Sequence, residues 1–327
     1  MNTSISRRRV VAALGAAVAA PWAHAQSKWP AKPIRIVVPF GAGGVADLTA
    51  RAVGQKLGEQ MGTSFVIDNR PGAGGVTAGN LVAQAEPDGY TLLLMSNGTA
   101  VSEGLFSKLP FDAEKDFAPI SLLGTFDIAV VVPENSPFKT LGDLLAEAKA
   151  KPGKLNIATI AVGSTQNLAA ELFKTTAGIQ AQVVPFNGTP AVVTALRGGE
   201  VDAGIEILAP IRSQITSKAL RALATFGEKR PLGLPDVPTA SESGGALKGL
   251  HIASWNALAA PAKTPKDVID RLAHECQVAL ASADLKKKLA DLSVDAKSST
   301  PQQLGSLLSS EIKRWSGVIG QAKIPKM

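Results

Sequence analysis

The chain of 327 residues is poor in the side chains that carry most catalytic and metal chemistry. It has one cysteine, three histidines and one tyrosine. Cys276 has no partner for an internal disulfide, and its apolar neighbours predict a buried thiol on a helix. Neither His251 nor His274 stands in a cluster with metal-ligand spacing. Motifs of serine hydrolases, zinc proteases and P-loop proteins are also absent. We therefore expect a protein without enzyme activity, catalytic residues, metal or cofactor.

Positive charge is in small excess. The chain holds 34 basic and 27 acidic residues, a net charge of +7. Loss of Arg7, Arg8 and Arg9 with an N-terminal segment would leave +4. With aromatic residues at 5%, this charge does not predict the basic, aromatic face that nucleic-acid binding requires. We expect no nucleic-acid partner, and the residual positive charge suits a small anionic ligand.

Long apolar runs are missing as well. The run 10–20 is too short to cross a bilayer, which takes about 20 residues. It follows three arginines and precedes Ala23-His24-Ala25, a small-x-small pattern typical of a signal-peptidase site. We predict a cleaved signal peptide over residues 1–25 and a periplasmic location. Ser6-Arg7-Arg8 is similar to a twin-arginine signal, so the twin-arginine and general export routes both stay open.

From residue 34 onward, short apolar runs alternate with helical patterns, as in α/β proteins. Apolar residues at three- and four-residue steps predict a helix over 45–61. Two longer helices are expected near the C-terminus, over 265–281 and 301–318. No flexible linker divides the chain, so if there are two lobes, strands or short segments must join them, and more than one crossing is allowed. The predicted strands are 34–38, 65–67, 91–95, 156–160, 182–186, 201–207 and 220–226.

Four glycine-containing junctions follow predicted strands and precede predicted helices. Free backbone N–H groups and the helix dipole make a helix start favourable for a carboxylate or phosphate. In open α/β sheets such loops lie at the carboxyl ends of the strands, where ligands bind. The alternative is that each glycine only forms a turn and each Ser, Thr or Asp only caps a helix. The junctions are 40–44 with Asp47, 71–75 with Thr77, 163–165, and 187–190.

The first junction also matches a dinucleotide-binding fingerprint. Gly41, Gly43 and Ala46 have its spacing, and Asp68 ends the next strand where an acid would hold a ribose hydroxyl. Against this, two residues separate the strand from Gly41, where the fingerprint has a tight turn. An exported NAD(P)-dependent oxidoreductase therefore stays open as an alternative function.

Motifs through nearly the whole chain resemble the Bug family, the periplasmic solute receptors of tripartite tricarboxylate transporters. Its two most specific signatures are similar to Asp68-Asn69-Arg70-Pro71-Gly72-Ala73-Gly74-Gly75 and Pro87-Asp88-Gly89-Tyr90-Thr91-Leu92. Further matching stretches are 29–40, 116–120, 184–188, 220–224, and Trp255 with Ala260-Pro261.

The resemblance implies an α/β, two-lobed fold of the type II periplasmic-binding kind, with the ligand cleft between the lobes. It implies one lobe from 26–125 and 250–327 and another from 126–249. It also implies capture of a small carboxylate (a di- or tricarboxylate, amino acid or aromatic acid) by a monomer that delivers it to membrane permease subunits. A sensor that docks on a membrane signalling protein is a further alternative. The implied ligand-binding residues are Phe40, Gly43, Gly44, Asp47, Ala73, Gly74, Ser96, Asn97, Gly163, Ser164, Thr165, Asn187, Gly188 and Glu206.

The sequence departs from the family pattern at two of these junctions. Residues 161–167 replace a Gly-Ser-Gly-Ser stretch followed by His. Phe186 stands where Tyr is usual, and Asn187 where Lys is common. Because a hydroxyl and a cation are lost, the ligand of any one relative cannot simply be transferred to this chain.

Overall fold

A mixed sheet of ten strands runs through the part of the chain that the computed structural model describes, residues 29–231 and 233–327. Residues 32–327 form one compact unit. The predicted signal peptide lies outside the described residues. Within those residues, no helix is both long and apolar enough to span a membrane. The strand order is β2-β1-β3-β9-β4-β7-β5-β6, and β8 and β10 also pair with β4.

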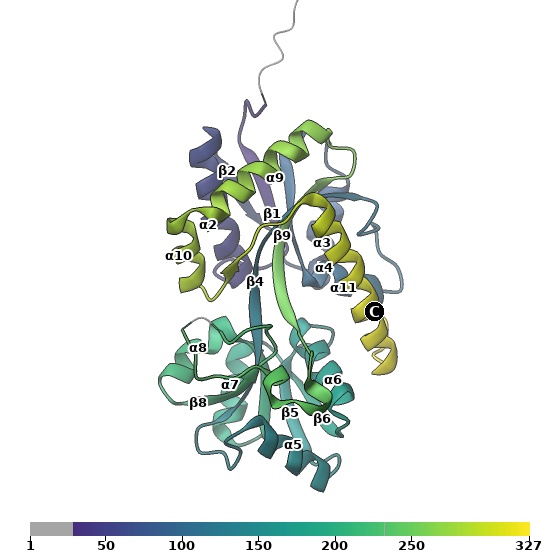
Figure 1. Cartoon of the computed structure of the whole chain (residues 1–327). Helices are drawn as coiled ribbons and strands as arrows, with labels where there is room; N and C mark the ends of the chain where they lie inside the picture. The colour runs from purple at the N-terminus through teal and green to yellow at the C-terminus, as the bar shows by residue number, and fades with distance from the viewer. Residues whose placement is uncertain (1–28, 232) are drawn as a thin grey trace, which may run out of the picture. The chain divides into compact units, whose positions relative to one another are not determined.

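The first lobe is built on three parallel strands, β1 (Ile34–Val38), β2 (Phe65–Asn69) and β3 (Thr91–Ser96). Strand β9 (Ala253–Pro261) pairs antiparallel with β3. Helices lie around this sheet in Figure 1. They are α2 (Val45–Met61), α3 (Val76–Ala83), α4 (Asn97–Leu105), α9 (Lys266–Ala281), α10 (Ala283–Asp291) and α11 (Pro301–Gln321).

The second lobe repeats this plan with the parallel strands β5 (Leu155–Ile160), β6 (Ala181–Phe186) and β7 (Ala203–Ile207). Strand β8 (Leu220–Thr225) pairs antiparallel with β4. The helices of this lobe are α5 (Leu141–Ala150), α6 (Thr165–Ala177), α7 (Thr189–Gly198) and α8 (Leu208–Thr216).

One long strand, β4 (Phe117–Pro133), belongs to both lobes (Figure 1). Its residues 117–127 pair with β9, and 124–125 also pair with β10 (Asp295–Ala296). Its residues 128–133 pair with β7 and β8. The fold prediction of two α/β lobes is therefore confirmed, and β4 and β9 are the strands that pass between them. The exact lobe boundaries at 125–126 and 249–250 stay a prediction.

The sequence patterns did not predict either crossing strand. β4 is almost entirely buried, so it lacks the alternation of a half-exposed strand, and its register shifts twice against β9. Among the described residues of the stretch 227–250 are two short 3-10 helices, Ala240–Ser243 and Gly245–Leu247, and no longer helix or strand. Several of its apolar side chains are nevertheless buried, including Val237, Ala240 and Leu247. Cys276 is fully buried on α9, as predicted.

Candidate ligand-binding site

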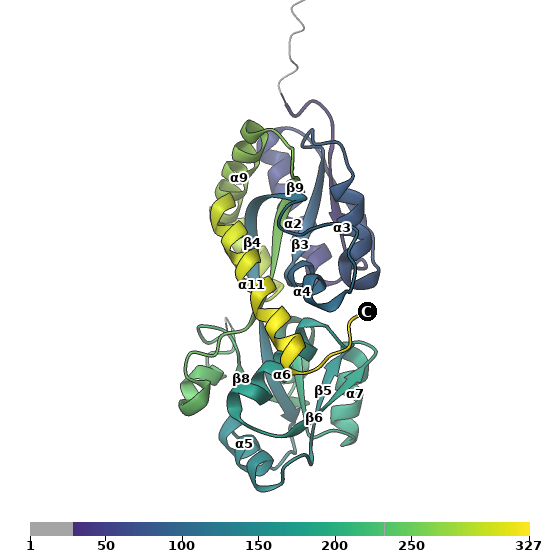
Figure 2. The same cartoon turned by 90° about the vertical axis from the view of Figure 1, so that its right-hand side faces the viewer.

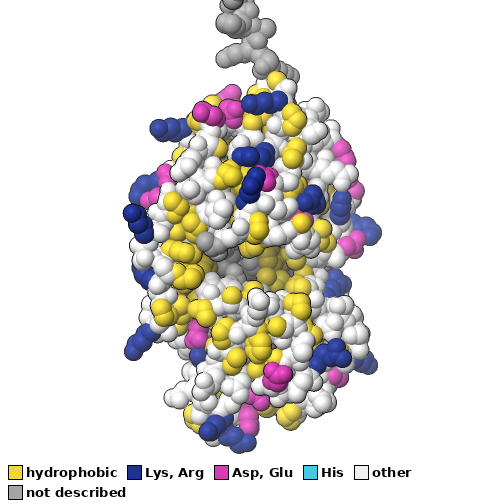
Figure 3. All heavy atoms as spheres, turned by 180° about the vertical axis from the view of Figure 1, so that it is seen from behind, with side chains coloured by type: hydrophobic (Ala, Val, Ile, Leu, Met, Phe, Trp, Pro, Cys, Tyr) yellow, Lys and Arg dark blue, Asp and Glu magenta, His cyan; other side chains and the backbone are white. Residues whose placement is uncertain are grey.

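The predicted loops lie where parallel strands end. In the first lobe they follow β1, β2 and β3 and lead into α2, α3 and α4. In the second lobe they follow β5 and β6 and lead into α6 and α7, and the predicted Glu206 lies near the end of β7. Since the strands within each lobe are parallel, their carboxyl ends meet at one edge of its sheet. A recess crosses the middle of the face seen in Figure 3, with hydrophobic side chains along it.

Asp47 is the residue that holds the first loop in shape. Its carboxylate accepts hydrogen bonds from the backbone N–H of Gly43 at 2.8 Å and from Asn69 at 3.0 Å, and it pairs with Arg51 at 2.9 Å. Asn69 also donates to the carbonyl of Phe40 at 3.0 Å. Burial raises the pKa of Asp47, but these hydrogen bonds outweigh burial and bring it below its ordinary value. The predicted ligand contact thus has a structural role in this arrangement, while Phe40 keeps an exposed ring.

The three loops of the first lobe touch one another. A Cβ added to Gly75 would lie 3.3 Å from the side chain of Pro39, and one added to Gly98 would lie 3.5 Å from the carbonyl oxygen of Gly74. Ala73 and Gly74 form the 3-10 turn that precedes α3. The structure therefore brings the predicted residues 40–44, 73–74 and 96–97 together.

Asn97 connects the two lobes. Its side chain is fully buried and donates to the hydroxyl of Thr165, on the first turn of α6, at 3.0 Å. Its carbonyl accepts from the indole N–H of Trp315 at 2.8 Å, and that N–H also lies 2.8 Å from Glu311. Trp315 lies on α11, which runs past α4 and reaches α6 in Figure 2. No sequence signal marked Trp315, which is 218 residues from Asn97.

The loop of the second lobe at 163–165 is organised like the loop around Asp47. The N–H of Gly163 donates to Asn167 at 3.1 Å, and the hydroxyl of Ser164 accepts from the N–H of Asn167 at 3.1 Å. Gly163 has φ +78°, and a Cβ there would lie 2.4 Å from Leu105 of the first lobe. Gly163 and Ser164 therefore shape the loop and its contact with α4, and Thr165 is the member of the three that faces Asn97.

Helix capping separates two kinds of loop. Ser96 and Ser164 accept backbone N–H groups and so cap α4 and α6 with their own side chains. In contrast, α2, α3 and α7 begin after Gly44, Gly75 and Gly188, and none of the three has a side-chain cap. The unpaired N–H groups of an uncapped first turn are the ones that a ligand anion can accept from.

Glu206 is the buried acid of the second lobe. It lies on β7 with no exposed surface. One oxygen, Oε2, accepts from Gln166 at 3.2 Å and from Thr189 at 3.1 Å. Burial raises its pKa to about 7, although both hydrogen bonds favour the charged form. Gln166 was not predicted, and Thr189 lies within the predicted junction 187–190 but was not among the implied ligand-binding residues. Both lie in first helical turns. Asn187, by contrast, is exposed beside Gly188.

The acid that the dinucleotide fingerprint requires is already engaged. Asp68 accepts two hydrogen bonds from Arg70, at 2.9 and 3.1 Å, and lies 3.6 Å from Arg35. These cations occupy the carboxylate that would otherwise hold ribose hydroxyls. The structure thus offers no support for dinucleotide binding beyond the glycine spacing.

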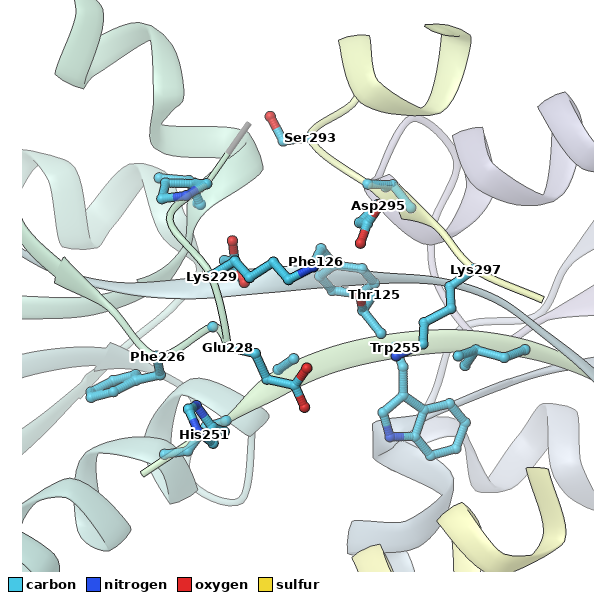
Figure 4. A pocket seen from close by; sticks show the side chains of 18 of the residues that line it. Thr125, Phe126, Phe226, Glu228, Lys229, His251, Trp255, Ser293, Asp295 and Lys297 are labelled. Carbon is cyan, nitrogen blue, oxygen red and sulfur yellow. The ribbon is translucent and has the colours of Figure 1, made fainter. Parts of the chain in front are cut away.

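A cavity of about 620 Å³ lies elsewhere, against the crossing strands. Figure 4 shows Thr125 and Phe126 of β4, Trp255 of β9, and Asp295 and Lys297 of the segment beside them. None of the predicted ligand-binding residues lines this cavity. We place the candidate site at the loops rather than here, because the uncapped helix starts and the buried acid are at the loops.

Comparison with known proteins supports the two-lobed fold and identifies the family of the chain. Residues 49–324 match the family model described as "Tripartite tricarboxylate transporter family receptor". The chain is 33% identical to Protein BugT of Bordetella pertussis over 318 residues, which covers 95% of this chain and 96% of BugT. The structure is similar to that of R. palustris Rpa4515 with adipate, with a TM-score of 0.80, 31% identity, and coverage of 91% of this chain and 100% of the other. It is also similar to MatC from Rhodopseudomonas palustris with bound malate, with a TM-score of 0.73, 30% identity, and coverage of 89% and 100%. The resemblance seen in the sequence is confirmed: the chain belongs to the tripartite tricarboxylate transporter receptor family.

Proposed function

We propose that this chain is a periplasmic solute-binding protein that captures a small carboxylate between its lobes and performs no chemistry on it. Two structural relatives are described with adipate and with malate, both of which are small carboxylates. The observation that carries the proposal is the set of helix starts at Gly44, Gly75 and Gly188, which lack side-chain caps. Each uncapped start offers a carboxylate the positive end of a helix dipole and the first-turn N–H groups that lack a partner. At α7 these exclude Pro190, which has no N–H, and Ala191, whose N–H donates to the carbonyl of Gly188.

The energy available at these loops is sufficient for capture. A helix dipole contributes roughly 0.3–1 kcal/mol per terminus. A hydrogen bond to a charged group contributes about 1.5–3 kcal/mol. Three or four such contacts together reach the roughly 8 kcal/mol of micromolar binding. The residues proposed to line the site are the predicted set, with Asp47, Gly163 and Ser164 acting by holding the loops in shape.

Delivery to membrane permease subunits is proposed from the family to which the chain belongs. Export by a cleaved signal peptide over residues 1–25 and a monomeric state belong to the same proposal. A receptor of this kind needs a cleft that opens and closes on its ligand, and β4 and β9 are the two strands that would bend.

The test uses residues 26–327 and a substitution that should stabilise α2 while weakening ligand binding. Gly44 has extended backbone dihedrals (φ −77°, ψ 166°), so a non-glycine residue fits there. Gly44→Asp adds an N-cap, which should leave stability equal or higher by a few tenths of a kcal/mol. The new carboxylate would occupy the N–H groups and repel an anion. We expect carboxylate affinity in calorimetric titration to fall by about tenfold or more, as one lost charge-assisted hydrogen bond implies.

Pro265→Asp is the matched control. Pro265 is the exposed N-cap of α9 and also lacks a capping hydrogen bond. It follows the end of β9, which is antiparallel to β3, so it lies at the opposite edge of the sheet from the loops. Its substitution should leave affinity unchanged. Equal affinity in Gly44→Asp and the unsubstituted protein would mean that the start of α2 does not bind the carboxylate. A shift in melting temperature with nicotinamide dinucleotides and with no carboxylate would overturn the proposal.

A further inference from the structure

One atom in the second lobe is buried without a partner. The side chain of Glu206 is fully buried, and its Oε2 accepts hydrogen bonds from Gln166 and Thr189. Its Oε1 is buried too and has no hydrogen-bond partner among the described residues. Buried polar atoms in folded proteins almost always have a partner, and leaving one unpaired costs about 1–3 kcal/mol. A free acceptor at this position therefore calls for a donor.

The position of this acceptor ties it to the ligand loops. Glu206 is the penultimate residue of β7. Gln166 is on the first turn of α6, next to Thr165, which bonds to Asn97 of the first lobe. Thr189 is the first residue of α7, directly after the uncapped start at Gly188. Glu206 thus lies between the start of α6, which Ser164 caps, and the uncapped start of α7, where the proposed ligand would bind.

The charge of Glu206 decides which chemical groups can approach it. Its side-chain partners Gln166 and Thr189 are both neutral. The backbone N–H of Ile207 also favours the charged form of its carboxyl, and Ala129 stands opposite it on β4. Burial raises the pKa of Glu206 to about 7, so it is mostly ionised at pH 8 and mostly neutral at pH 6. When ionised, it attracts a donor or a cation and repels a second carboxylate. A ligand with two ionised carboxylates would meet favourable N–H groups at one end and this acid at the other.

This inference rests on the proposed function. We propose that Glu206 is the specificity-determining residue of the second lobe, and that the bound carboxylate carries a hydrogen-bond donor, an ammonium or a hydroxyl group, at the end that reaches β7. The donor supplies the partner that Oε1 lacks. A ligand of this class is an amino acid or a hydroxy acid rather than a simple dicarboxylate.

Calorimetric titration with matched acids tests the inference. The probes are hexanoate, 6-hydroxyhexanoate, 6-aminohexanoate and adipate, together with the corresponding four- and five-carbon series, all at pH 8. For the chain length that binds best, the amino or hydroxy acid should bind at least about tenfold more tightly than the dicarboxylate, because one charge-assisted hydrogen bond is worth about that factor. Glu206→Gln should remove most of this preference by weakening the amino acid and strengthening the dicarboxylate. Glu200→Gln is the control, because Glu200 is exposed on the same lobe.

A second measurement needs no variant and holds if Glu206→Gln fails to fold. The dicarboxylate should bind the unsubstituted protein about tenfold more tightly at pH 6 than at pH 8, because protonation of a group with a pKa near 7 removes the repulsion. The amino acid should weaken over the same range. A dicarboxylate that binds at least as tightly as the amino and hydroxy acids at pH 8, with no pH dependence, would overturn the inference and leave the proposed function intact. Absence of binding by every acid, with no carboxylate released on denaturation, would defeat the proposed function itself.

Discussion

The buried carboxyl of Glu206 makes the stability of this protein depend on pH in a predictable way. The folded-state pKa is about 7, compared with an ordinary value of 4.5. A raised carboxyl pKa means that the folded state favours the protonated form, so stability is fully present below the ordinary pKa and is lost as pH rises through the folded one. The difference of 2.5 units, at about 1.4 kcal/mol per unit, corresponds to about 3 kcal/mol between pH 4 and pH 8.

Glu206→Gln removes this titration and keeps the shape of the side chain. The amide oxygen can still accept from Gln166 and Thr189, and the amide nitrogen takes the place of the unpartnered Oε1. We therefore expect the variant to be more stable than the unsubstituted protein by about 2–3 kcal/mol at pH 8, because only the unsubstituted protein carries a buried charge there. Near pH 4 the two proteins should have equal free energies of unfolding.

Equilibrium urea denaturation at steps between pH 4 and pH 8 measures this difference. Both proteins are first unfolded and dialysed, because a retained ligand would stabilise the folded state by mass action. The decisive quantity is the slope of the stability difference with pH between about 4.5 and 7. A difference that stays constant over this range would mean that Glu206 ionises normally, and the burial argument would be wrong.

Three further perturbations test Asp127, a partly buried acid of β4 in the cavity against the crossing strands, and two residues that shape the site. Asp127→Asn should stabilise the protein by about 2–3 kcal/mol at pH 8 and by nothing below pH 4, measured by urea denaturation, because burial and then Asp295 raise the pKa of Asp127 from 3.8 to about 6. Asp47→Ala should destabilise it by about 2–4 kcal/mol at pH 7, since several charge-assisted bonds are lost. The lowered pKa of Asp47 means that this loss should shrink as pH falls below 3.8, and a pH-independent loss would contradict it. Gly163→Ala should lower the melting temperature, because φ is positive at Gly163 and the new Cβ meets Leu105. Adding Leu105→Ala should recover part of this loss. If it recovers nothing, the contact with Leu105 is not the cause.

Local sequence determined most of the elements and the chemistry of the loops. Apolar runs such as 34–38 and 156–160 predicted strands, and the glycines after them predicted helix starts that could accept an anion. These features depend on neighbours within a few residues, so they can be read directly from the chain. The same patterns missed β4 and β9, because polar residues, glycine or proline interrupt their apolar runs and their partners are distant in sequence.

Tertiary structure alone decided which of the predicted residues hold the loops in shape. Asp47 and Ser164 carry the side chains expected of ligand contacts, yet their hydrogen bonds are taken by Gly43 and by Asn167. Only the packing of the two lobes brings Asn97 to Thr165, 68 residues away. The burial of Glu206, which sets its pKa, likewise comes from elements that the sequence separates. Capping is local and is determined by the chain, whereas burial and pairing across lobes are set by contacts between distant segments.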